Sequence, residues 1–89
     1  MIKRFRYSSR FEKKLKYFSS EQKREIISEI ENFTQDPFAA HLRTHPLRPS
    51  MTEQYSFSVS PNLLITFRFL KPDRSEVLFY DIGGHEIYK

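Results

Sequence analysis

The sequence predicts a small α+β domain, in which an N-terminal two-helix hairpin packs on one face of an antiparallel-dominated sheet of about four strands. Two observations lead to this fold class. A chain of 89 residues is long enough for a single domain with one modest core. Apolar residues recur at helical spacing in the first half of the chain and mostly alternate with polar residues in the second half. We therefore expect one domain over residues 1–89.

The chain is predicted to begin with a strand and a short helix. Residues 2–7 alternate in character, which is typical of a strand with Phe5 and Tyr7 on one face. Ser9 and Glu12 have the spacing of a capping box and predict the start of a helix. The apolar stripe of that helix is Phe11, Leu15 and Phe18.

A second helix is predicted from about Glu21 to Gln35. Ser19 offers its N-cap, with Gln22 three residues later, and Asp36-Pro37 ends it because proline disfavours helical geometry in the preceding residue. The predicted buried stripe consists of Ile26, Ile27, Ile30 and Phe33. A serine break between two short helices favours an antiparallel hairpin.

The second half of the chain is predicted to form the rest of the sheet. Residues 38–51 suggest an irregular connection with one short strand around Leu42 to Leu47. Strands follow at Gln54–Ser60, Leu63–Leu70 and Glu76–Ile82, joined by turns at Pro61-Asn62 and at residues 71–74. The last strand is expected to stop at the glycine pair, Gly83-Gly84.

Arg68 is the only charged residue of the apolar strand. If it shares a face with Leu64 and Thr66, it projects from the side of the sheet without helices. The opposite, apolar face then carries Leu63, Ile65, Phe67 and Phe69. A cation on the open side suits a phosphate, although an ordinary exposed arginine fits the same pattern.

Composition narrows the class of protein. The absence of cysteine excludes disulfides and thiolate sites, and the absence of a long apolar run excludes a membrane helix and a signal-peptide core. We therefore expect a cytoplasmic protein.

The basic charge of the chain is uneven. The formal net charge is +4, and residues 1–24 hold nine basic residues, whereas their only acidic residues are Glu12 and Glu21. Such a surface suits a polyanion or an acidic protein, or is simply a solvated helix surface.

Three histidines are candidates for chemistry. With no cysteine and no carboxylates at ligand spacing, a metal site is a weak hypothesis, and we expect neither metal nor cofactor. His41 is interpreted as an ordinary surface side chain. His45 precedes the strand hairpins and His85 follows the last strand, so that a meander can bring the two together.

These residue types are sufficient for RNA cleavage. One group must accept the proton of a ribose 2′-hydroxyl, a cation must stabilise the crowded phosphate, and another group must protonate the leaving oxygen. Histidine can perform either proton transfer near neutral pH, and arginine binds phosphate. Tyr88 could stack on a base or donate a proton.

Three motifs together resemble a known family. His45-Pro46-Leu47, the strand YSFSV followed by an apolar strand ending FRF, and the tail DIGGHEIY resemble the RelE/ParE superfamily of toxin–antitoxin toxins, nearest its RelE/YafQ-like branch. The resemblance spans nearly the whole chain. It implies a RelE-like β-α-α-β-β-β order and a ribosome-dependent, metal-independent messenger-RNA endonuclease. It also implies a cognate antitoxin, which we expect to be short and acidic or amphipathic and to cover the basic helices or the active face.

The resemblance also implies site residues. Carried over by position, the catalytic residues are His45, Arg68, His85 and Tyr88, and Arg48 falls where relatives often place a basic residue. We expect Arg48 to bind RNA, together with Arg43 and Asn62. Two positions depart from the branch, which carries a histidine and an aspartate where this chain has Ser58 and Asn62. Neither replacement is an effective base at neutral pH.

This departure keeps two other functions open. One is a ParE-like toxin that inhibits DNA gyrase, and the other is an inactive relative that serves as an antitoxin-binding module.

The glycine pair Gly83-Gly84 is expected to let the chain turn sharply and place His85 at the mouth of a cleft. The alternative is a tail that packs against the sheet edge.

Overall fold

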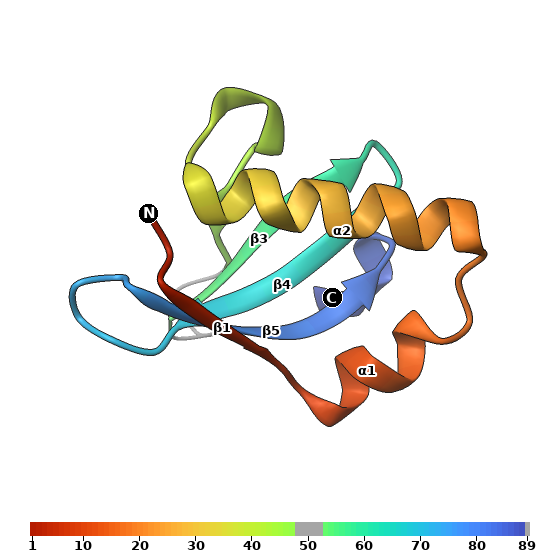
Figure 1. Cartoon of the computed structure of the whole chain (residues 1–89), viewed down its shortest axis with the longest axis horizontal. Helices are drawn as coiled ribbons and strands as arrows, with labels where there is room; N and C mark the ends of the chain where they lie inside the picture. The colour runs from red at the N-terminus through yellow and green to blue at the C-terminus, as the bar shows by residue number, and fades with distance from the viewer. Residues whose placement is uncertain (48–52, 89) are drawn as a thin grey trace.

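The computed structural model of the chain describes residues 1–47 and 53–88 (Figure 1). Its elements, in chain order, are β1 (Arg4–Tyr7), α1 (Ser9–Leu15), α2 (Ser20–Gln35), the 3₁₀ helix η1 (Ala40–Leu42), β2 (His45–Pro46), β3 (Gln54–Ser60), β4 (Leu63–Phe69), β5 (Glu76–Gly83) and the 3₁₀ helix η2 (His85–Tyr88). No helix in the described part of the chain is long and apolar enough to cross a membrane.

The strands form one sheet in the order β1-β5-β4-β3-β2. Neighbouring strands are antiparallel except for β1 and β5, the first and last strands of the chain, which pair in parallel with Arg4 opposite Glu76. Figure 1 shows α2 lying across this sheet and α1 beside the end of β5. The predicted α+β class is confirmed, with five strands in place of about four.

Serine caps begin both helices. Ser19 forms the predicted capping box, accepting a hydrogen bond from the Gln22 amide at 3.1 Å while the Gln22 side chain accepts from the Ser19 amide at 2.9 Å. The predicted Ser9 cap is wrong by one residue. Ser8 is the cap of α1, because its amide donates to the carbonyl of Phe79 and its hydroxyl accepts from the Phe11 amide.

The core lies between α2 and the sheet. Phe33 stacks on Phe57 at 4.5 Å between ring centroids and meets Phe67 edge-on at 4.7 Å. The fully buried apolar side chains include Phe11, Ile26, Ile30, Phe33, Leu42, Phe57, Ile65, Phe67, Val77, Phe79 and Ile82. The prediction that Ile27 belongs to this stripe is wrong, since Ile27 is 39% exposed. Ile27 follows the buried Ile26, and consecutive residues of a helix lie about 100° apart around its axis. The Ile27 side chain therefore points away from the sheet.

β4 has the two faces that its sequence predicts. Ile65 and Phe67 are buried towards the helices, while Arg68 is exposed on the other side, which we call the open face. Leu64 and Thr66 lie on the open face but are also buried. The open face is therefore covered near the middle of β4 and exposed at Arg68.

A buried carboxylate joins α1 to the sheet. Asp81 lies opposite Thr66 and is 3% exposed. Its carboxylate contacts Lys14 Nζ at 2.7 Å and Arg10 at 3.7 Å. These ion pairs hold α1 against the end of β5, directly before the tail of the chain.

The strand predicted around Leu42 to Leu47 is shorter than expected. Only His45 and Pro46 pair with β3, opposite Ser56 and Tyr55. Leu42 belongs to η1 and is fully buried, because the 3₁₀ turn directs it into the core. The rest of the predicted connection, from residue 48, lies outside the described residues.

Candidate active site

A cleft of about 600 Å³ lies at the edge of the sheet where β2 begins and β3 extends past it. It combines side chains from α2, η1, β2, β3, β4 and η2. The lining residues are Glu29, His41, Arg43, His45, Ser58, Val59, Ser60, Pro61, Leu64 and His85. The structure thus brings together His45 and His85, which are 40 residues apart in sequence.

The orientation of His45 follows from one hydrogen bond. Its Nδ1 lies 2.8 Å from the carbonyl oxygen of Arg43. A carbonyl only accepts hydrogen bonds, so that Nδ1 carries the proton. The neutral ring then has its lone pair on Nε2, which is the form a general base requires.

His85 is the first residue of η2 and is exposed. The expected sharp turn at the glycine pair is not a left-handed one, because neither Gly83 nor Gly84 has a positive φ. The reason for glycine at position 83 is close approach instead. A Cβ there would lie 2.6 Å from Cγ2 of Ile87. The absence of a side chain at Gly83 lets η2 pack onto the end of β5, which places His85 at the cleft.

The segment that enters β2 contributes three alternate residues to the cleft: His41, Arg43 and His45. Arg43 has a left-handed backbone, with φ 52°. The sequence led us to interpret His41 as an ordinary surface residue, but it lines the cleft, and its Nε2 lies 3.2 Å from Glu29 Oε1. The spacing of His41, Arg43 and His45 at i, i+2 and i+4, directly before and into a strand, could have indicated that the three side chains line the same cleft.

Arg68 is not among the described residues that line the cleft. It is exposed on the open face, opposite Gln54 and Leu78, with an ion pair of 3.9 Å to Glu53. It lies two residues along β4 from Thr66. Because Thr66 pairs with Ser56, and Ser56 with His45, Arg68 shares a face with His45 but lies further along the sheet.

The remaining predicted site residues differ in position. Asn62 is exposed in the turn between β3 and β4, next to Pro61 at the cleft. Ser58 lines the cleft on β3, opposite Leu64. Arg48 lies outside the described residues. The backbone of Tyr88 belongs to η2, but the placement of its side chain lies outside what the structure describes.

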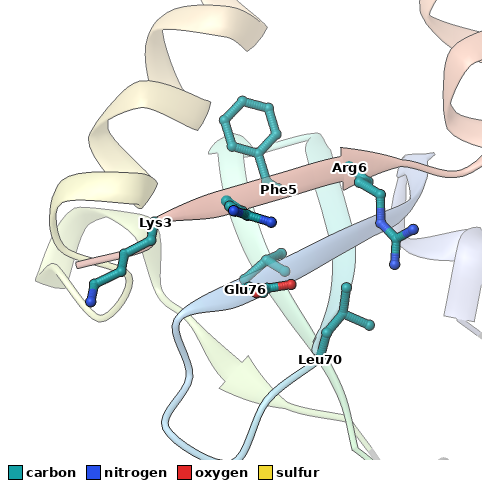
Figure 2. A pocket seen from close by; sticks show the side chains of 7 residues that line it. Lys3, Phe5, Arg6, Leu70 and Glu76 are labelled. Atoms are coloured by element: carbon teal, nitrogen blue, oxygen red, sulfur yellow. The ribbon is translucent and has the colours of Figure 1, made fainter.

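A second cleft, of about 490 Å³, follows the free edge of the sheet (Figure 2). Lys3, Arg4, Phe5 and Arg6 line it from the start of the chain, with Leu70, Glu76 and Val77 from β5 and the turn that precedes it. In Figure 2, Phe5 and Arg6 project from opposite sides of β1. The charged side chains of this lining are Lys3, Arg4, Arg6 and Glu76.

The described residues contain no group of three histidine, aspartate or glutamate side chains arranged to hold a metal ion. The groups that line the first cleft are imidazoles, a guanidinium group, hydroxyls and one carboxylate. Such groups can transfer protons and bind phosphate.

Comparison with known proteins gives structural relatives only. No family model and no curated protein matches the sequence. A YoeB/ParE toxin from Agrobacterium tumefaciens superposes with a TM-score of 0.76 at 14% identity, over 92% of this chain and 98% of that one. The RelBE2 toxin–antitoxin complex from Mycobacterium tuberculosis gives 0.75 at 10% identity, over 96% of this chain and 100% of the matched chain.

YafQ from Escherichia coli superposes with a TM-score of 0.72 at 20% identity, over 92% of both chains. These similarities span nearly the whole chain. The chain therefore shares its fold with these toxin structures, which agrees with the fold that the resemblance of its sequence motifs implies.

Proposed function

We propose that this protein is the toxin of a type II toxin–antitoxin system and cleaves messenger RNA on the ribosome. The observation that carries the proposal is the cleft that His45 and His85 both line, with Nδ1 of His45 hydrogen-bonded to the Arg43 carbonyl. The toxin fold of the structural relatives supports it.

In the proposed reaction, the two histidines divide the proton transfers. Nε2 of His45 accepts the proton of the ribose 2′-hydroxyl, and the 2′-oxygen forms a bond to the adjacent phosphorus. The bond from phosphorus to the 5′-oxygen breaks, and His85 protonates that leaving oxygen. The products are a 2′,3′-cyclic phosphate and a 5′-hydroxyl, and the step needs no metal ion.

Cations are required for the charge that develops on the phosphate. We assign this role to Arg43, which lines the cleft, together with Arg68 on the same face of the sheet. Arg68 would have to exchange its ion pair with Glu53 for the phosphate, which is a small cost because both side chains are largely exposed. Arg48, Asn62 and Tyr88 remain proposed contacts to the RNA.

The proposed protein partner is a cognate antitoxin. The relative from Mycobacterium tuberculosis was solved as a toxin–antitoxin complex, and so was the E. coli DinJ–YafQ pair. We infer that an acidic protein covers part of this chain in the same way.

A second candidate is gyrase inhibition without RNA cleavage. It is favoured by Ser58 and Asn62, which replace a histidine and an aspartate of the RelE/YafQ-like branch and remove two proton-transfer groups. The name of the Agrobacterium relative, YoeB/ParE, includes this class of toxin.

Primer extension separates these functions. A defined message is translated in a reconstituted reaction with the wild-type protein, His45→Ala or His85→Ala. We expect new 5′ ends at codon-registered positions with the wild type and at least about a hundredfold less cleavage with either variant, because each loses a proton-transfer group. Arg24→Gln, at an exposed position of α2, is the control and should cleave normally. An intact message with the wild type would reject the nuclease, and a supercoiling assay with gyrase would then test the alternative.

A further inference from the structure

His41 is a third imidazole in the cleft. It lies in η1, where Leu42 is fully buried and fixes the turn in the core. The neighbouring His41 is thereby directed outward, with its side chain 55% exposed. Together with His45 and His85, it forms part of the cleft lining.

Glu29 orients the His41 ring. The Glu29 side chain is 20% exposed, and its Oε1 also accepts a hydrogen bond from the Asn32 side chain at 2.7 Å. Because a carboxylate only accepts, Nε2 of His41 carries the proton in their 3.2 Å contact. Nδ1 is the nitrogen left to face a ligand, whereas in His45 it is Nε2.

The proposed reaction does not need His41 as an acid or a base. Cleavage needs one base and one acid, which His45 and His85 supply. A third imidazole beside Arg43 is therefore suited to an electrostatic role, because a protonated imidazole donates a hydrogen bond from Nδ1 to a phosphate oxygen. The backbone phosphates that flank the cleaved position are the anions that such a cleft would meet.

We propose that His41, held by Glu29, binds an RNA phosphate next to the one that is cleaved. This inference rests on the proposed function, since it takes RNA as the ligand of the cleft. His41 then contributes to RNA affinity rather than to the chemical step. Protonated His41 and Arg43, two residues apart on one wall of the cleft, would then both bind phosphate.

The test measures binding without cleavage. The probe is a fluorescent single-stranded RNA whose riboses are all 2′-O-methylated, and anisotropy gives its affinity for the full chain at pH 5.5 over a range of salt concentrations. We expect His41→Gln to weaken binding about fivefold and to lower the slope of log K against log salt by about 0.7, the value for one phosphate contact in a single strand. His41→Arg should restore both quantities, which a merely structural role would not predict.

Arg24→Gln is the matched control, because it removes one positive charge from an exposed position of α2 that does not line the cleft. It should leave the slope unchanged. Equal slopes for the wild type and His41→Gln, or no binding of the probe by the wild type, would overturn the inference. Primer extension tests the nuclease separately: cleavage by the wild type with no effect of His41→Gln on RNA affinity would refute only the role of His41.

Discussion

At the scale of single residues, Gly83 controls where the C-terminal tail lies. A β-carbon at this position would lie 2.6 Å from Ile87 Cγ2, which belongs to a branched side chain with few alternative rotamers. At Gly84 the close atom is Oε1 of Glu86, at 2.5 Å, and this carboxylate can swing into solvent. A methyl group is therefore tolerated better at Gly84 than at Gly83.

We accordingly predict that Gly83→Ala lowers RNA cleavage about ten- to a hundredfold, because a displacement of η2 near 1 Å misplaces His85. The measurement is the primer-extension rate, with thermal unfolding to show that the variant is folded. Gly84→Ala is the adjacent control and should cleave nearly as well as the wild type. Equal rates for both variants would show that Ile87 does not constrain His85.

At the scale of the elements, capping decides where each helix begins. Ser19 and Gln22 satisfy each other's backbone amides, which fixes the first turn of α2. The helix that begins there carries Ile26, Ile30 and Phe33 into the core and Glu29 to the cleft. The capping box thus affects both the core and the site.

Ser19→Ala is predicted to reduce the free energy of unfolding by about 1 kcal/mol, the usual cost of losing a serine cap. Urea denaturation followed by circular dichroism measures this change. Ser20→Ala removes a neighbouring exposed hydroxyl in the first turn and should change the stability by much less. A loss of the same size in both variants would mean that the cap contributes nothing specific.

At the scale of the whole molecule, the positive charges of residues 1–24 include three groups. Lys14 and Arg10 are engaged by the buried Asp81. Lys3, Arg4 and Arg6 line the edge cleft of β1 (Figure 2). Lys13 and Lys16 lie around the end of α1, and no ion pair to them is found within the described residues. Of these groups, the second and third are available to an acidic partner.

We therefore predict that the double substitution Lys13→Gln and Lys16→Gln weakens binding of the cognate antitoxin about tenfold and reduces the salt dependence of association. Titration calorimetry at two salt concentrations measures both. Lys71→Gln, in the turn between β4 and β5, removes one charge elsewhere as the control. Unchanged affinity would place the antitoxin on another surface.

The two α-helices and the strands β1, β3, β4 and β5 could be predicted from the sequence, because local periodicity and capping act over a few residues. The strict alternation of Gln54–Ser60, the stripe of α2 and the Ser19 capping box are all present in the fold. The family resemblance likewise rested on short motifs, and the fold confirms it at the level of architecture.

Only the tertiary structure decided which distant residues meet. Ser8 is the cap in place of Ser9 because Phe79 of β5 binds its backbone amide, and Ile27 is exposed because it lies on the side of α2 that faces away from the sheet. His41 lines the cleft because burial of Leu42 directs its neighbour outward. Arg68 does not line the cleft and lies further along the open face than its place in the motif suggests. Such outcomes depend on strand register and helix docking, which arise from contacts between segments far apart in the chain and leave little signal in any one of them.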